Sequence, residues 1–329
     1  MPPALARLAC PSPDPSGEPL PFRKVCAILN PESRNGGGRR VREIVAERLG
    51  DLLIRVDQAG YRGHAVELAR RAAAEGADAV VAIGGDGTIN EVINGLAGSG
   101  VALGILPRGA ANDLARLHGI PEDLAAACDV IREGALRRAD LVRVNHRLFA
   151  TAGGIGLPCE IASIADRIKR DGPAGKLLVG LLGSNVYVLA VLVALRNKPS
   201  RAVVTLHRDG VSRRVDALSL MINNQPFLGR RFRMAPGALH DDGRFDVCVI
   251  HGHESRWSVL PLLLRVLLGR HTASTQVESW RGEKLRLTAD WPISFFGDGE
   301  IFPAAAELRI ELLPQALSVI VPGVSSHLG

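Results

Sequence analysis

A short run near residue 80 constrains the fold more than any other part of the sequence. It spans Val80–Glu91 and reads VVAIGGDGTINE, an apolar strand followed by a glycine turn and directly by a helix. Backbone N–H groups gather at such a turn, because glycine has no Cβ to block the approach of a ligand. The positive end of the following helix adds to the attraction for an anion. The run therefore predicts a phosphate site, and a nucleotide triphosphate fits it best.

Asp86 lies inside this glycine turn. A carboxylate beside phosphates needs a cation, and a bridging Mg²⁺ ion would remove the repulsion. Asp86 is therefore a candidate for the reaction itself. The turn matches neither the GxxxxGK[ST] loop of P-loop enzymes nor the GxGxxG loop of dinucleotide folds. Thr88 and Glu91 also admit a purely structural interpretation, a T-x-x-E capping box at the start of the helix.

A second turn follows the next predicted strand. It spans Pro107–Arg116 and reads PRGAANDLAR, with Asn112 or Asp113 as the predicted N-cap of a helix. In a parallel sheet both turns lie at the carboxyl edge, where ligands bind. A plain loop with a helix cap is the alternative interpretation of this segment.

The first half of the chain alternates strands and helices. Strands are predicted at Lys24–Asn30, Leu52–Val56, Ala79–Ile83 and Val101–Leu106, and helices up to about Leu49, at His64–Ala74 and at Thr88–Leu96. This alternation predicts an α/β domain, in which helices cover the two faces of a parallel sheet in three layers. The strands read as continuous apolar runs, as buried parallel strands do.

The pattern changes after about residue 150. A long helical region at Pro158–Leu195 and a helix at Ser255–Arg270 accompany short predicted strands at Ala202–His207, Val211–Ile222, Phe245–Ile250, Lys284–Leu287, Pro292–Phe296 and Leu308–Leu312. Turn residues separate the strands, which indicates an antiparallel β-sandwich with inserted helices. We therefore expect a disordered Pro-rich tail at 1–21, a nucleotide domain at 22–150 and a β-sandwich domain at 151–322. The last strand is expected to return to the first domain.

Composition limits the partners. The net charge of +6 suits a polyanion or a membrane surface, while only 4% aromatic residues argue against a platform for single-stranded nucleic acid. The five cysteines form no CxxC pair, which favours a reducing cytoplasm over a zinc site. Polar residues interrupt the apolar stretch Leu177–Leu195, so a buried or membrane-touching helix is favoured over a membrane span.

Six motifs in order resemble those of the diacylglycerol kinase catalytic-domain family, which includes sphingosine kinases and bacterial lipid kinases. The resemblance covers about Phe22 to Pro322. The matching segments are Asn30-Pro31-x-Ser33, Gly63-His64-Ala65, Gly84–Glu91, Pro107–Arg116, Ala235-Pro236 with Asp242-Gly243 and Asp246, and Asp298-Gly299-Glu300.

The resemblance implies a two-domain fold with ATP in the cleft. By this likeness the nucleotide-binding residues are Asn30, Asp57, Gly84, Gly85, Asp86, Gly87, Thr88, Ile89, Asn90 and Ala110. Asp57 and Ala110 stand where the family usually has a nucleotide-contacting threonine, so both positions lack that hydroxyl group. The segment Leu239–Arg244 resembles a Mg²⁺ loop, with the Asp242 carboxylate and the backbone of Leu239 and Arg244 as ligands; a plain Asp-Asp-Gly turn is the alternative.

Phosphoryl transfer needs an aligned hydroxyl group, neutralised phosphate charge and a base for the hydroxyl proton. Glu300 is our candidate base, and Asp298 is expected to hold a catalytic Mg²⁺ or to orient the site. Their i, i+2 spacing on an extended segment would point both side chains the same way. Asp86 is the rival base, and a hairpin turn with two solvated carboxylates is the structural alternative.

The expected activity is phosphorylation of a hydroxyl group on a membrane lipid such as diacylglycerol or a sphingoid base, with ATP and Mg²⁺ as cofactors. The enzyme would then be cytoplasmic and peripherally associated with the membrane. Two alternatives stay open: a kinase resembling NAD kinases, and a non-catalytic module that binds lipid or nucleotide. No nucleic-acid partner is expected, and a homodimer is compatible with the sequence without being indicated by it.

Overall fold

The structure is a computed structural model that describes residues 22–31, 38–170, 186–196, 201–229, 232–252 and 259–323. The chain divides into two compact units. Unit 1 runs up to Ala139 and resumes at Gln315, and unit 2 spans Asp140–Pro314. The Pro-rich tail predicted at 1–21 lies outside the described residues.

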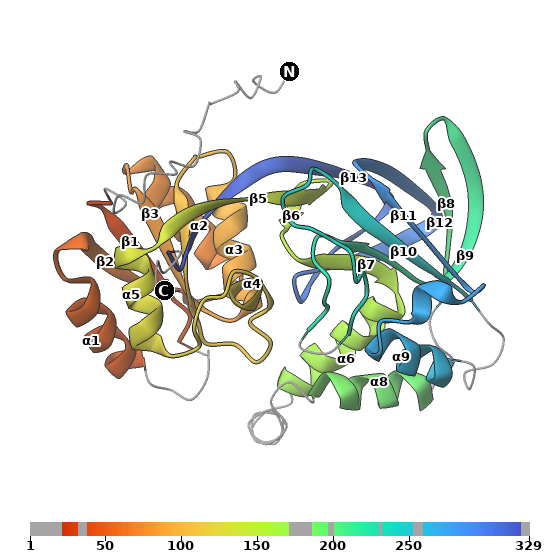
Figure 1. The fold of residues 1–329 in the computed structure, drawn as a ribbon, viewed down its shortest axis with the longest axis horizontal. Coiled ribbons are helices and arrows are strands. Elements are labelled where there is room, and N and C mark those ends of the chain that lie inside the picture. The colour runs from red at the N-terminus through yellow and green to blue at the C-terminus, as the bar shows by residue number, and fades with distance from the viewer. Residues whose placement is uncertain are drawn as a thin grey trace, which may run out of the picture. The chain divides into compact units, whose positions relative to one another are not determined.

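A parallel sheet forms the centre of unit 1 (Figure 1). Its strands are β1 (Val25–Leu29), β2 (Leu53–Gln58), β3 (Ala79–Gly84) and β4 (Ala102–Pro107), in the order β4-β3-β1-β2. The end of β13 (Glu300–Val321) pairs in parallel with β4 through Val319 and Leu103. Every residue of β1, β3 and β4 is buried, as their continuous apolar sequences predict.

Helices complete unit 1. They are α1 (Gly38–Leu49), α2 (His64–Ala74), α3 (Asp86–Leu96), α4 (Asp113–Leu117) and α5 (Leu124–Glu133), with a short 3₁₀ helix at Gly50–Leu52. Helix α2 packs against α3, and α1 packs against α5. The bounds of α2 agree with the prediction, whereas α3 begins at Asp86, two residues before the predicted Thr88.

Antiparallel strands dominate unit 2. They are β5 (Ala135–Val144), β6 (Arg147–Phe149), β7 (Ala152–Gly156), β8 (Ala202–Arg208), β9 (Val211–Asn223), β10 (Phe245–His251), β11 (Val277–Gly282), β12 (Lys284–Gly297) and β13, and residues of β5 and β13 fall in both units. Strands β9 and β12 each pair with both β7 and β8. These four strands therefore form a closed circuit of backbone pairing.

Strand β9 shows how the core of unit 2 is built. Its residues Val215, Leu220 and Ile222 belong to a core supplied by strands alone. Leu218 and Met221 belong instead to a second core, to which the helices also contribute. Successive side chains of a strand point to opposite faces, so Met221 faces one core while Leu220 and Ile222 face the other. A shift of register in the pairing of β9 with β10, between Ala217 and Ser219, changes the alternation for the residues before it.

Among the described residues of unit 2, the strands are accompanied by the helices α6 (Leu157–Arg170), α8 (Val186–Arg196) and α9 (Val259–Leu267), with a 3₁₀ turn at His271–Ala273. They lie together on one side of the β7, β9 and β10 strands (Figure 1). The predicted helix at Pro158–Leu195 corresponds to α6 and α8, and residues 171–185 between them are not described. Among the helices that are described, none combines the length and the apolar character needed to cross a bilayer.

Some predicted strands of unit 2 were too short. The segments predicted at Lys284–Leu287 and Pro292–Phe296 are one strand, β12, with shifts of register between Thr288 and Phe295. The segment predicted at Leu308–Leu312 is the middle of β13. The prediction left residues 288–291 between two strands, whereas the structure continues β12 through them with an irregular register, where polar residues and proline are accommodated.

Candidate functional site

The glycine turn after β3 and the turn after β4 lie against each other at the carboxyl edge of the unit 1 sheet. A Cβ on Gly109 would come within 2.7 Å of Gly85 Cα, and a Cβ on Gly84 would come within 2.6 Å of the Thr88 side chain. Only glycine permits this approach. Residues 85–87 remain partly exposed, so the backbone at the start of α3 is accessible where helix N–H groups lack partners within the helix.

The Asp86 carboxylate holds the second turn in place. Its Oδ2 accepts the backbone N–H of Asn112 at 3.0 Å, and its Oδ1 accepts that of Asp113 at 2.7 Å. The Asn112 side chain in turn accepts the N–H of Gly109 at 2.7 Å. Asp86 therefore satisfies the first amides of α4, a role that the sequence did not reveal.

Asn30 and Thr88 join the end of β1 to the glycine turn. Asn30 Nδ2 donates to Thr88 Oγ1 at 3.0 Å. Asn90, a predicted nucleotide-binding residue, is buried, and its side-chain and backbone oxygens accept hydrogen bonds from Asn94. Ile89 is buried as well. The side chains of Ile89 and Asn90 therefore pack in the interior of unit 1.

The capping box predicted for Thr88 and Glu91 is wrong. Helix α3 has Gly85 as its N-cap, so Thr88 lies within the first turn. Glu91 instead reaches the N-terminus of α2, where its carboxylate accepts the N–H groups of Gly63 at 2.8 Å and Ala65 at 3.2 Å. A capping box and a cap on a neighbouring helix need the same residue types, so the sequence could not separate them.

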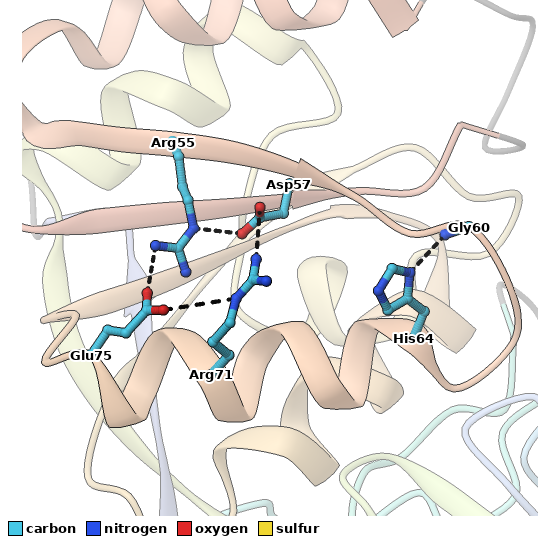
Figure 2. A network of polar contacts seen from close by, with 6 residues as sticks. All are labelled: Arg55, Asp57, Gly60, His64, Arg71 and Glu75. Carbon is cyan, nitrogen blue, oxygen red and sulfur yellow. Dashed lines mark hydrogen bonds and ion pairs between the residues drawn. The ribbon is translucent and has the colours of Figure 1, made fainter.

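Asp57 lies on β2 within a network of charged side chains (Figure 2). Its carboxylate binds Arg55 at 2.7 Å and Arg71 at 3.0 Å, and both arginines also contact Glu75. The two positive and two negative groups balance. The negative charge at this predicted nucleotide position is therefore neutralised by its own neighbours. Ala110, the other departure from the family pattern, lies partly exposed in the turn after β4.

Asp298 and Glu300 lie at the hairpin between β12 and β13. Asp298 (φ 49°) and Gly299 (φ 86°) form the two-residue turn, and Glu300 pairs with Gly297 as the first residue of β13. The expectation that both carboxylates share one face of an extended segment is therefore wrong. Asp298 is only 7% exposed, whereas Glu300 is half-buried.

The Asp298 carboxylate binds backbone amides of unit 2. Its Oδ2 accepts the N–H of Ala150 at 2.8 Å, and its Oδ1 accepts the N–H and the hydroxyl of Thr151 at 2.8 and 2.6 Å. Of its two predicted roles, this geometry favours orientation of the hairpin that carries Glu300.

The predicted metal loop at Leu239–Arg244 is a turn that binds β5 and β11. Asp242 Oδ1 accepts the N–H of Arg244 at 3.1 Å, and its Oδ2 contacts Arg281 at 3.1 Å. Asp246 lies close by, and burial raises the pKa of its carboxyl group, although Arg281 opposes the shift. Within the described part of the chain, no group of three or more His, Cys, Asp or Glu side chains is arranged for a metal ion.

A cavity of about 950 Å³ opens in unit 2 between α6, α8 and the strands β7, β8 and β12. Its volume is within the usual range for small-molecule sites. Apolar and charged side chains share its wall, among them Ile155, Ile164, Val193, Ile293, Glu160 and Arg167. Cys159 adds a neutral group, since burial raises the pKa of its thiol to about 12.

The sequence pointed to this cavity only in part. Val193 belongs to the apolar stretch Leu177–Leu195, for which the sequence favoured a buried or membrane-touching helix, and residues 177–185 lie outside the described residues. The described side chains of the predicted helix at Ser255–Arg270 do not line the cavity. Helix α6 supplies much of the lining. Its sequence mixes apolar, polar and charged residues, so it did not indicate a binding site.

Two family models match the chain in succession. The "Diacylglycerol kinase catalytic domain" matches residues 24–144, and the "YegS C-terminal NAD kinase beta sandwich-like domain" matches residues 175–321.

Among curated relatives, a "Probable lipid kinase YegS-like" protein of Klebsiella pneumoniae is 33% identical over 79% of this chain and 84% of its own length. A "Diacylglycerol kinase" of Mycobacterium tuberculosis is 29% identical over 91% of this chain and 95% of its own length. A diacylglycerol kinase structure from Bacillus anthracis has a TM-score of 0.70 at 22% identity, covering 92% of this chain and 98% of that one, which supports the fold.

Proposed function

This chain belongs to the diacylglycerol kinase catalytic-domain family, and from that premise we propose that it is an ATP- and Mg²⁺-dependent lipid kinase. It would transfer the γ-phosphoryl group of ATP to a hydroxyl group of a membrane lipid such as diacylglycerol or a sphingoid base. The observation that carries the proposal is the pair of turns at the carboxyl edge of the unit 1 sheet. Gly85 and Gly109 bring these turns into contact, and Asp86 fixes them.

The turns suit a triphosphate. Exposed backbone at 85–87 opens α3, and a helix N-terminus that ends a buried strand attracts anions. In this assignment Asp86 is a positioning residue, since both of its oxygens accept amides of the second turn. Asp57 does not oppose the nucleotide, because Arg55 and Arg71 offset its charge.

The cavity of unit 2 is the proposed site for the acyl chain of the lipid. Isoleucine and valine side chains cover part of its wall, while Glu160 and the exposed Arg167 offer polar contacts for the more polar end of the molecule. An amphipathic ligand matches such a lining better than a wholly polar metabolite.

Glu300 is the proposed general base for the lipid hydroxyl group. Glu300 is half-buried at the start of β13. The turn just before it is fixed by three hydrogen bonds that the Asp298 carboxylate accepts. A base held in one orientation serves proton transfer better than one on a mobile loop. Asp298 is then a positioning residue.

A structural Mg²⁺ ion near Asp242 stays part of the proposal, and Asp242 would exchange its contact with Arg281 for the ion. Asp246 Oδ2 is buried without a hydrogen-bond partner, and Asp242 adds to the electrostatic cost of ionising Asp246. Carboxylate and backbone oxygens are the ligands that Mg²⁺ prefers. The Asp242 carboxylate and the carbonyl groups of Leu239 and Arg244 would hold this ion, and Mg²⁺ bound with ATP would neutralise phosphate charge.

The test is transfer of ³²P from [γ-³²P]ATP to a total lipid extract in mixed vesicles, with and without EDTA. We expect a labelled lipid that depends on Mg²⁺ and is absent from reactions with the Glu300→Gln variant. Diacylglycerol, sphingosine and NAD, offered separately, identify the acceptor. Labelled NAD would favour the NAD kinase alternative, and ATP binding with no transfer to any acceptor would favour a non-catalytic module.

Filling the cavity should weaken lipid binding selectively. In Ile164→Trp, a large ring on the cavity wall should raise the KM for long-chain diacylglycerol about tenfold, because excluding two methylene groups costs roughly 0.8 kcal/mol each. The KM for ATP should stay unchanged. Leu264→Trp on the exposed surface of α9 is the matched control, since Leu264 does not line the cavity. An unchanged lipid KM in Ile164→Trp would place the acyl chain elsewhere.

A further inference from the structure

Tyr61 is an exposed aromatic residue on the loop that joins β2 to α2. Its side chain is 59% exposed. The ring stacks on His64, with the two ring centroids 4.5 Å apart and the planes at 4° to each other. One face of the tyrosine ring is thus covered by the imidazole, and the exposure of the residue leaves the other face available.

Hydrogen bonds hold this pair in place. The Tyr61 hydroxyl group donates to Glu67 Oε2 on α2 at 2.8 Å. His64 Nδ1 accepts the backbone N–H of Gly60 at 3.0 Å (Figure 2). Each ring is therefore fixed both by the stack and by a polar contact. A ligand that stacked on Tyr61 would meet a preorganised surface, so less side-chain freedom would be lost on binding.

The loop is also attached to the elements that carry the glycine turn. At its start, the N–H of Ala59 donates to the carbonyl group of Leu29, the last residue of β1, at 2.9 Å. At its end, Glu91 of α3 accepts the N–H groups of Gly63 and Ala65. Glu91 lies five residues after Asp86 on one helix, a rise of about 8 Å. The aromatic pair and the phosphate-binding turn therefore belong to one connected framework within unit 1.

We propose that the free face of Tyr61 is the stacking platform for the purine base of the nucleotide whose triphosphate lies at the glycine turns. The inference rests on the proposed nucleotide site and adds the group that recognises the base. Aromatic side chains bind bases through their π-faces, and each such contact typically contributes about tenfold or more to affinity. Asp57, near the end of the strand that leads into this loop, is paired with Arg55 and Arg71, so its charge is offset.

Calorimetric binding of ATP and of inorganic tripolyphosphate, each with Mg²⁺, tests the platform in the full chain. Wild type should bind ATP about tenfold more tightly than tripolyphosphate. Tyr61→Ala should lose this advantage and still bind tripolyphosphate normally. Tyr61→Phe is the matched control: it loses the contact with Glu67 but keeps the ring, and it should retain most of the ATP affinity.

A fluorescence measurement keeps the test independent of whether Tyr61→Ala folds. The triphosphate of 2-aminopurine riboside should lose fluorescence on binding to the wild type, because stacking quenches this base. Quenching should persist in Tyr61→Phe. No quenching on the wild type, or unchanged ATP affinity in a folded Tyr61→Ala, would overturn the platform.

These outcomes are separable from failure of the proposed function. A wild type that transfers phosphate to lipid but binds ATP no more tightly than tripolyphosphate contradicts the platform alone. A wild type that binds neither compound contradicts the nucleotide site, and the platform with it.

Discussion

Replacement of Glu300 by glutamine is expected to lower kcat for lipid phosphorylation by about 10²–10⁴-fold, the usual value of a positioned general base. Glutamine keeps the size and hydrogen-bonding capacity of the side chain but cannot take the proton of the attacking hydroxyl group. The KM values for ATP and lipid should change little, because the lost contribution belongs to the transition state. The thermal midpoint should also be preserved, since Glu300 is half-buried at the start of β13.

Glu307→Gln is the matched control for this variant. Glu307 is on the same strand and pairs with Arg309, so its substitution removes a carboxylate from β13 without touching the hairpin. Steady-state kinetics with [γ-³²P]ATP should give near-normal turnover for Glu307→Gln. Near-normal turnover in Glu300→Gln as well would remove Glu300 from the role of base and would return attention to Asp86.

Most strands and helices of unit 1 were predictable because local sequence determines them, although helix α5 was not among the predicted elements. An apolar run as short and β-branched as Ala79–Ile83, followed by two glycines, favours a buried strand over a helix, and the three- and four-residue spacing of His64–Ala74 identifies one face of a helix. The position of the glycine turn followed from the same pattern. The start of α3 could not be predicted in the same way, since Asp86 and Gly87 are residue types typical of turns and loops.

The partners of the acidic site residues could not be predicted. Asp86, Glu91 and Asp298 all accept backbone N–H groups, and for each residue these groups belong to a segment distant in sequence. Residue types indicate that a carboxylate will find donors, but only the tertiary fold decides which ones. The turn at Asp298-Gly299 had a local signal, because Asp-Gly favours a two-residue hairpin. We gave more weight to the family motif than to that signal.

The second unit was harder to predict than the first. The sequence indicated antiparallel strands, yet the closed pairing of β7, β8, β9 and β12 depends on contacts far apart in the chain. The layered sandwich arrangement and the catalytic and nucleotide-binding roles of the site residues stay predictions. The cavity is a property of how α6 and α8 pack on strands, which periodicity does not encode.

The second large effect is a loss of stability, which we expect from the Asp298→Ala substitution. The substitution leaves the N–H groups of Ala150 and Thr151 and the Thr151 hydroxyl group without their acceptor. Each buried donor left unpaired costs about 1–3 kcal/mol, so the free energy of unfolding should fall by roughly 3 kcal/mol or more. Alanine is also disfavoured at a φ of 49°, which adds about 1 kcal/mol.

The Asp209→Ala variant is the control for stability. It measures the cost of alanine at a positive φ without the loss of buried hydrogen bonds. Asp209 also has a φ of 49° and also precedes a glycine in a two-residue hairpin, but its side chain is 79% exposed and pairs with Arg208. Urea denaturation with unchanged m-values should therefore show a loss of only about 1 kcal/mol for Asp209→Ala. If Asp298→Ala were no less stable than this control and yet inactive, the carboxylate would act on the substrate or a metal ion, and its role as the anchor of the Glu300 hairpin would be wrong.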